Sequence, residues 1–220
     1  MTPSGIPLAG RVAVLGSPGS GKSTFCHALA GTGIPLFHLD DLYWRPGWRR
    51  TPPDEWRRLV RDLVSGERWI VDGNHLDTVP ERLARAEIVV LLDLPVVVCA
   101  WQVVRRSVRL RRHRGADGEY LPRGLRPADP PVRDLPALLR KVLGFRRREL
   151  VQMRRLLAGY DGRVVVCRSR RAARTARREL TALLRARPTA TGPPPTAADP
   201  TPCTCGGPDR AAVSLPLEDR

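Results

Sequence analysis

A short glycine-rich stretch near the start of the chain has the residue types and the spacing that bind phosphate groups. Residues 16–23 read Gly-Ser-Pro-Gly-Ser-Gly-Lys-Ser and fit the pattern G-x-x-x-x-G-K-[ST]. Glycines let backbone N–H groups surround phosphates, and the positive end of a following helix attracts an anion. We therefore predict a site for ATP or GTP, with Lys22 on the outer phosphates and the Ser23 hydroxyl on Mg²⁺. The alternative is a glycine-rich turn that only connects two elements. The predicted nucleotide-binding residues of this stretch are Gly16, Ser17, Pro18, Gly19, Ser20, Gly21, Lys22, Ser23 and Thr24.

Carboxylates follow three of the apolar runs that are typical of buried strands. They are Asp40, Asp41, Asp72 and Asp93. Parallel α/β sheets place their sites beyond the carboxyl ends of the strands, where a carboxylate can hold Mg²⁺ through water or accept a proton from an acceptor hydroxyl. Each could instead cap a strand end or pair with a nearby arginine. We favour a functional role for Asp40 and Asp72 and leave Asp41 and Asp93 open.

Arginines are dense on both sides of a stretch rich in Gly, Pro and Asp, residues 115–136, which we predict to be a mobile loop. Phosphoryl transfer builds negative charge on equatorial oxygens, and one well-placed arginine contributes on the order of 10³–10⁵ in rate. Some of these arginines should therefore act in catalysis, whereas most are expected to be solvated surface groups. The set comprises Arg105, Arg106, Arg109, Arg111, Arg112, Arg114, Arg123, Arg126, Arg133, Arg146, Arg147 and Arg148.

The elements that must position these residues can be predicted from apolar patterns. Strands are expected at 11–15, 34–39, 68–72, 87–93 and 163–167. Helices are expected at 22–30, from about 54 onward, at 95–112, 138–157 and 171–186, with a loop at 40–53. Because strands and helices alternate, we predict an α/β fold with a parallel sheet and helices on both faces. The pairing order cannot be predicted from the pattern.

The length and composition predict one domain and a tail. Residues 188–220 are Pro-rich and lack periodic apolar positions, so we predict a domain at 1–187 and a disordered tail. We expect no secretory signal, and the most apolar run, 88–101, is broken by Asp93 and Pro95 and is too short to span a bilayer. The five cysteines favour free thiols over disulfides or a zinc site. These features predict a cytoplasmic protein without a membrane partner.

The charge balance is strongly basic. The chain has 38 basic and 22 acidic residues, a formal net charge of +16, and only Lys22 and Lys141 are lysine. A bias of the source genome would explain arginine over lysine, but it does not explain the excess over acids. Nucleotides or nucleic acid therefore remain possible polyanionic partners, although the sequence contains no helix-turn-helix or RNP-type motif.

Several stretches together resemble one protein family. They are the glycine-rich loop, residues 38–48 with their Asp-x-x-Tyr-Trp-x-Pro-Gly-Trp core, residues 66–74, and shorter matches at 82–86, 91–95 and 168–170. On these residues the chain resembles the adenylate-kinase-related P-loop NTPases known as topology modulation (FlaR-like) proteins, over about 11–184. The glycine-rich loop is shared by many families, whereas the Tyr-Trp-x-Pro-Gly-Trp stretch is far more particular.

The resemblance implies a fold and a set of site residues. The implied fold is the three-layer P-loop NTPase fold of nucleoside-monophosphate-kinase type, with five parallel strands, an acceptor-binding segment and an Arg-rich lid at about 114–136. Asp72 resembles the aspartate that begins the acceptor loop of adenylate kinases, which would place it beside Mg²⁺. Arg106 resembles the arginine that opens the lid. Arg168 falls where the adenine-contacting loop begins.

The chain also departs from adenylate kinases. Asn74 and His75 stand where an aromatic residue, Pro and Arg usually follow Asp-Gly, so AMP is not the expected acceptor. Gln102 stands where another Arg is usual, and the lid lacks a cysteine quartet for zinc. His75 could contact an acceptor or bond only to backbone. Trp44 and Trp48 could form a pocket wall or only pack the loop onto the core.

The function expected from these residues is phosphoryl transfer from ATP, with Mg²⁺, to a nucleotide or a small hydroxyl compound. The alternatives are a nucleotide-dependent regulator or DNA-binding (DNA topology modulation) protein with little kinase activity, and a nucleotide-binding module with little turnover. Ser23 and, through water, Asp72 are the predicted Mg²⁺ residues, and Arg168 joins the nucleotide-binding set. The predicted catalytic residues are Lys22, Asp40, Asp72 and Arg106.

Overall fold

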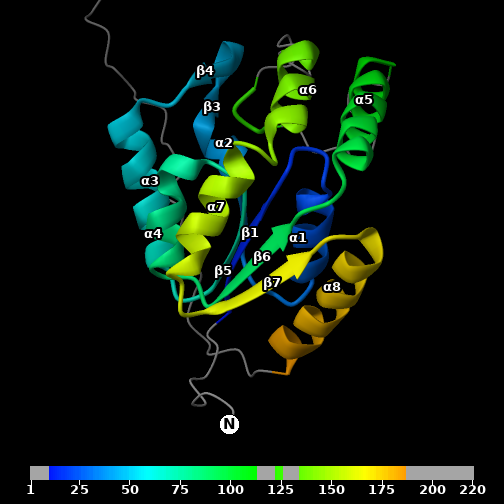
Figure 1. Ribbon diagram of the computed structural model, residues 1–220. Helices are drawn as coiled ribbons and strands as arrows, with labels where there is room; N and C mark the ends of the chain where they lie inside the picture. The colour runs from blue at the N-terminus through cyan, green and yellow to red at the C-terminus, as the bar shows by residue number, and fades with distance from the viewer. Residues whose placement is uncertain (1–9, 113–121, 126–133, 187–220) are drawn as a thin grey trace, which may run out of the picture. The chain divides into compact units, whose positions relative to one another are not determined.

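Five parallel strands form the sheet at the centre of the structure, a computed structural model that describes residues 10–112, 122–125 and 134–186 (Figure 1). The strands are β1 (Arg11–Gly16), β2 (Leu36–His38), β5 (Trp69–Asp72), β6 (Ile88–Leu92) and β7 (Arg163–Cys167). Their order is β2-β5-β1-β6-β7, which places β1 in the middle. All five strands occur where the apolar runs predicted them, so the parallel α/β sheet of the prediction is confirmed.

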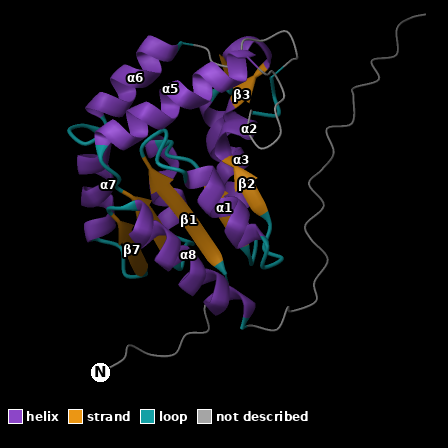
Figure 2. Ribbon diagram, turned by 90° about the vertical axis from the view of Figure 1, so that its right-hand side faces the viewer, coloured by secondary structure: helices purple, strands orange, loops and turns teal. Residues whose placement is uncertain are grey.

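Helices cover both faces of this sheet. On one side lie α1 (Lys22–Ala30) and α8 (Arg170–Arg185), and on the other α3 (Pro53–Ser65), α4 (Val79–Leu83) and α7 (Glu149–Ala158) (Figures 1 and 2). Side chains alternate along β1, so that Val12 and Val14 enter one core while Ala13 and Leu15 enter the other. These strand residues are buried on both faces, as expected for a parallel sheet between helical layers.

Two further helices, α5 (Val96–Arg112) and α6 (Leu135–Gly144), pack against each other beyond the carboxyl end of the sheet (Figure 1). The single helix predicted at 138–157 is in fact two, α6 and α7. Helix α6 ends at Gly144, and the next residue, Phe145, is buried in the core on the α3 side of the sheet. No helix in the described part of the chain is both long and apolar enough to cross a membrane.

The segment predicted as a loop at 40–53 is structured. It contains a short helix, α2 (Leu39–Tyr43), and a small antiparallel ladder of β3 (Trp44–Arg45) and β4 (Arg49–Arg50), joined by a 3-10 turn, η1 (Pro46–Trp48). Gly47 has a φ of 72° in that turn, a conformation that glycine adopts without strain. A 3-10 turn, η2 (Leu76–Thr78), and α4 were also not predicted, because these one-turn elements are too short to show periodicity.

The remaining organisational predictions fall largely outside the described residues. The trace divides into a unit of Met1–Pro188 and a second unit of Thr189–Arg220. The predicted tail, 188–220, lies outside the described residues. Of the predicted lid, 114–136, the structure describes only 122–125 and 134–136, the last two of which already belong to α6. The tail and the lid therefore stay predictions.

Candidate active site

The glycine-rich loop connects β1 to α1, as the sequence pattern predicts. Gly19 has a φ of 76°, and a Cβ atom there would lie 2.3 Å from the carbonyl oxygen of Cys99 on α5. Gly21 precedes the first helical residue with a φ of 89°. The loop therefore needs glycine for its backbone conformation and, at Gly19, for its close packing against α5. This strand–turn–helix arrangement fits the binding of nucleotide phosphates.

Lys22 begins α1 and lies over this loop. Its Nζ donates hydrogen bonds to the carbonyl oxygens of Gly16, at 2.9 Å, and Ser17, at 3.1 Å. These contacts hold the ammonium group at the carboxyl end of the central strand, where the outer phosphates of a nucleotide would lie.

Asp72 stands beside Ser23 at the end of the neighbouring strand. The Ser23 hydroxyl donates to Asp72 Oδ2 at 2.7 Å, and the same oxygen lies 2.9 Å from His38 Nδ1. Register explains the placement, since Asp72 is paired with Val14 on β1 and with His38 on β2. The other carboxylate oxygen, Oδ1, is buried and has no hydrogen-bond partner.

This pair of side chains fits Mg²⁺. A hydroxyl and a carboxylate are the hard oxygen groups that Mg²⁺ prefers, and a water shared with the ion would satisfy the buried oxygen of Asp72. Among residues 10–112, 122–125 and 134–186, no group of three or more His, Cys, Asp or Glu side chains is placed to hold a metal ion by itself. Mg²⁺ at Ser23 and Asp72 would therefore depend on phosphate and water for its other ligands.

Asp40 and His75 form a second polar pair next to the loop. His75 Nε2 lies 3.0 Å from Asp40 Oδ1, and because an ionised carboxylate can only accept, Nε2 carries the proton. The Asp40 side chain is 49% exposed. Partial burial alone would raise the pKa of Asp40. The hydrogen bond and charge of His75 and the positive charges of two lysines lower this pKa, and together they outweigh the effect of burial. The pKa of Asp40 therefore lies below its usual value.

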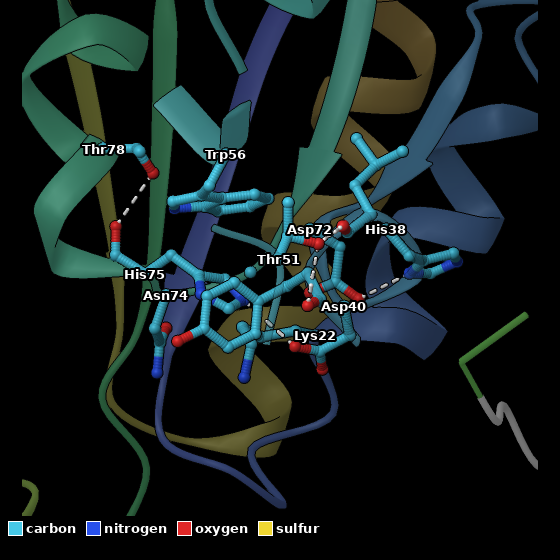
Figure 3. A network of polar contacts seen from close by, with 12 residues as sticks. Lys22, His38, Asp40, Thr51, Trp56, Asp72, Asn74, His75 and Thr78 are labelled. Atoms are coloured by element: carbon cyan, nitrogen blue, oxygen red, sulfur yellow. Dashed lines mark hydrogen bonds and ion pairs between the residues drawn. The ribbon is translucent and has the colours of Figure 1, made fainter. Parts of the chain in front are cut away.

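Aromatic rings fix the orientation of His75. Its ring centroid lies 4.5 Å from that of Tyr43 and 4.8 Å from that of Trp56, which Figure 3 shows above it. Thr51 donates to the carbonyl oxygens of Leu42 and Tyr43, which holds the end of α2 in place. His75 thus bonds to a side chain, whereas the more conservative prediction was a bond to backbone.

Trp44 and Trp48 pack edge-to-face, with centroids 5.3 Å apart. Both alternatives for this pair, a wall of an acceptor pocket or plain packing of the segment, remain predictions.

Two of the predicted strand-end carboxylates, Asp41 and Asp93, form contacts with arginine residues. Asp93 is 3% exposed and forms ion pairs at 3.0 Å with Arg146 and with Arg154 on α7. Asp41 accepts a hydrogen bond of 2.7 Å from the backbone N–H of Arg123, within the small described part of the predicted lid. Of the two explanations left open for these acids, pairing with arginine is the one that the contacts support.

The predicted sites at Arg106 and Arg168 lie on different elements. Arg106 is half-buried on α5, one turn beyond Val103, which packs next to Gly19. Arg168 is exposed and directly follows β7, so it lies, like Asp93, at the carboxyl ends of the strands. Nothing in these contacts tests the roles of either arginine, which stay predictions.

Two residues that sequence reasoning missed also belong to this region. Lys141 on α6 acts with Lys22 on the charge of Asp40, so both lysines of the chain lie in electrostatic range of that carboxylate. Their rarity in an Arg-rich chain was a usable signal. Arg82 is 1% exposed and contacts the loop that follows β5. Its one signal in the sequence is that it begins the 82–86 stretch of the family resemblance, which indicates neither burial nor a role.

Comparison with known proteins gives a likeness of fold. No family model and no curated protein matches the sequence. A shikimate kinase from Acinetobacter baumannii in complex with shikimate superposes with a TM-score of 0.48 at 18% identity, over 79% of this chain and 91% of that chain. A gluconokinase from Sinorhizobium meliloti gives a TM-score of 0.43 at 17% identity, over 80% and 92%. A shikimate kinase from Bacteroides thetaiotaomicron gives 0.44 at 15%, over 80% and 98%. These TM-scores are all below 0.5, so the likeness assigns no acceptor. The α/β fold, with the glycine-rich loop between β1 and α1, rests on the structure itself.

Proposed function

We propose that this protein is an ATP-dependent phosphotransferase of adenylate-kinase-like architecture that passes the γ-phosphoryl group to a hydroxyl of a nucleotide or a small molecule. One observation carries the proposal. Asp40, a half-exposed carboxylate, stands at the end of β2 within electrostatic range of Lys22 on the glycine-rich loop. A bare nucleotide-binding module would need the loop, Ser23 and Asp72, but it would have no use for a second carboxylate within electrostatic range of Lys22.

The nucleotide side of the site would work through the residues of the loop and of β5. Lys22 would exchange its contacts with backbone carbonyls for the outer phosphates of ATP, drawing charge away from the transferred group. Ser23 and Asp72 would hold Mg²⁺, which, when bound, neutralises charge on the phosphate oxygens. Arg106 is our candidate for the residue that stabilises the charge of the transferred phosphoryl group. Arg168 is our candidate for the residue that contacts the base of the nucleotide.

The acceptor side would work through Asp40. An aspartate is ionised at neutral pH, and the lowered pKa of Asp40 leaves it so, which allows it to accept the proton of the acceptor hydroxyl. The acceptor oxygen then bonds to the γ-phosphorus while the bond from that phosphorus to the leaving ADP oxygen breaks. His75 holds the carboxylate in one orientation during this transfer.

The net charge of +16 favours one other candidate, a nucleotide-dependent regulator that binds nucleic acid, as the resemblance to topology modulation proteins would imply. A salt titration of binding to a mixed-sequence DNA duplex tests it. For a protein that neutralises phosphates, the logarithm of the binding constant falls steeply and linearly with the logarithm of the salt concentration.

Cys26, Cys99 and Cys167 are free and buried, which supports the cytoplasmic location proposed from the sequence.

A screen of acceptors tests the phosphotransferase. ADP release would be followed with Mg·ATP and a panel of nucleoside monophosphates, sugar acids and small alcohols, with Lys22→Ala as the control. We expect at least one acceptor to raise ADP release in the wild type and none to do so in Lys22→Ala. Tight Mg·ATP binding without acceptor-dependent turnover would favour the binding module, and equal ADP release by both proteins would contradict the proposal.

A further inference from the structure

A buried arginine holds the loop between the two halves of the site. Arg82, on α4, is 1% exposed, and its guanidinium group donates only to backbone carbonyls of the loop that follows β5. Nη1 donates to Gly73 at 2.7 Å, Nη2 to His75 at 2.9 Å and also to Asn74, and Nε to Thr78 at 3.2 Å. One planar side chain therefore fixes the path of residues 73–78, which we call the clamp loop.

The clamp loop contacts both halves of the site through two consecutive side chains. Asn74 Oδ1 accepts a hydrogen bond of 3.0 Å from the backbone N–H of Gly16, the first residue of the glycine-rich motif. His75 reaches the opposite way and bonds to Asp40 at 3.0 Å. Arg82 Nη2 donates to the backbone carbonyls of these same two residues.

The backbone of this loop is strained where it turns. His75 has a φ of 28°, which a residue with a side chain rarely adopts. Thr78 donates to the same His75 carbonyl from its backbone N–H, at 3.0 Å, and from Oγ1, at 3.1 Å. Together with Arg82 Nη2, three donors therefore hold that peptide group. A strained conformation persists only where neighbouring groups fix it, and such positions concentrate in functional sites.

A role in packing alone would not require an arginine. Burial lowers the pKa of Arg82 to about 10, which shows that the charge is costly in this place. An apolar side chain of similar size would fill the volume at lower cost, but it would remove the donors to the carbonyls of Gly73 and Asn74. The His75 carbonyl would keep only its donors from Thr78. The five fixed donors of a guanidinium group are suited to a cluster of carbonyl oxygens.

We propose that Arg82 is a positioning residue that couples the nucleotide-binding loop to the acceptor carboxylate by fixing Asn74 and His75 in one loop conformation. It touches neither substrate and acts through these two residues. The acceptor half of this inference rests on the proposed function, whereas the nucleotide half requires only that the glycine-rich loop bind Mg·ATP.

Three variants separate the two arms of the coupling. Asn74→Ala removes only the contact with Gly16, and His75→Gln removes only the imidazole that contacts Asp40. Arg82→Gln disturbs both. We expect Arg82→Gln and Asn74→Ala to weaken Mg·ATP binding, measured by calorimetry, by roughly tenfold, within the range of coupling in a shared hydrogen-bond network. His75→Gln should leave this affinity unchanged.

The ring nitrogens of His75, followed by ¹⁵N NMR, report the acceptor arm without knowledge of the acceptor. The hydrogen-bonded Nε2–H signal should be present in the wild type and in Asn74→Ala, and lost in Arg82→Gln and in Asp40→Asn. Arg85→Gln is the matched control, because Arg85 lies three residues further on, is exposed, and donates only to Ser65. It should match the wild type in both measurements.

Two further measurements keep the inference testable if Arg82→Gln does not fold. Arg82→Lys retains the charge but not the fork, and should show a smaller loss in both measurements. In the wild type, Mg·ATP should shift the His75 ring signals, and Asn74→Ala should abolish most of that shift. Wild-type nucleotide affinity and an intact His75 signal in a folded Arg82 variant would overturn the inference, as would a shift that survives in Asn74→Ala. Failure of the wild type to bind Mg·ATP would instead overturn the proposed function.

Discussion

The close approach of the glycine-rich loop to α5 can be tested with two glycines of nearly equal conformation. Gly19 has a φ of 76° and Gly33 a φ of 80°. A Cβ atom at Gly19 would lie 2.3 Å from the carbonyl oxygen of Cys99 and 2.9 Å from Val103, whereas one at Gly33 meets nothing within 4 Å. Alanine at either position therefore carries the same backbone strain, and only the variant at Gly19 adds a collision.

The size of the difference follows from these contacts. The left-handed conformation costs a residue with a Cβ about 1–2 kcal/mol, a term common to Gly33→Ala and Gly19→Ala. Overpacking against rigid neighbours adds roughly 1–3 kcal/mol. The atom in the way is helical backbone of α5, which cannot rotate aside. For a domain of this size, Gly19→Ala should therefore melt roughly 2–12 °C below Gly33→Ala.

Thermal unfolding of both variants without nucleotide, followed by circular dichroism, measures the difference. Mg·ATP calorimetry on the same samples should show a weakened affinity for Gly19→Ala only, because its loop must move to relieve the collision. Equal melting temperatures of the two variants would refute the reasoning, since the loop and α5 would then not be packed as closely as the structure has them.

Three other predictions concern charges around the phosphates. Asp72→Asn should weaken the Mg²⁺ dependence of ATP binding, whereas Asp40→Asn should leave calorimetric Mg·ATP affinity intact and damage transfer to the acceptor; the opposite pattern would reverse the two assignments. His75→Gln removes a contact that lowers the pKa of Asp40, so that pKa should rise and the acid limb of the pH–rate profile should move to higher pH. A profile that does not move would exclude Asp40 as the base. Lys141→Gln should barely change the melting temperature, since the exposed ion pair between Lys141 and Glu149 is worth about 0–1 kcal/mol. The same variant should raise the KM for the acceptor. An unchanged KM would leave Lys141 outside the acceptor site.

The sheet and the phosphate loop could be predicted because their signals are local. A buried parallel strand is a short apolar run, as in β1 and β6, and the glycine-rich motif is contiguous. The order of the strands could not be predicted, because β1 pairs with strands that lie more than fifty residues away, and an apolar run does not encode its partner. Short elements such as α2 and α4 were missed because a single turn shows no period.

The acceptor side of the site could be predicted only in part, for the same physical reason. Asp40 and Asp72 could be selected as candidates because strand ends are recognisable in sequence, and their roles stay predictions. The contact between His75 and Asp40 was not predicted, because it joins the short helix α2 to the clamp loop and depends on a strained backbone that no residue pattern signals. Arg82 begins the stretch 82–86 that contributes to the family resemblance, but in a chain with so many arginines nothing in that stretch indicates that this one is buried and contacts the loop after β5.

The distribution of lysine shows how composition can nevertheless indicate a site. Among 38 basic residues only Lys22 and Lys141 are lysine, and the charges of both act on Asp40. Arginine offers a flat fork that suits fixed, bidentate partners, such as the carboxylate of Asp93 or the carbonyls around Arg82. Lysine offers a compact ammonium group on a flexible stem, which can follow a phosphate that moves during transfer. Most ion pairs in the described part of the chain are formed by arginine. We infer that lysine occurs where a mobile point charge has a use, within electrostatic range of the carboxylate to which we assign the acceptor proton.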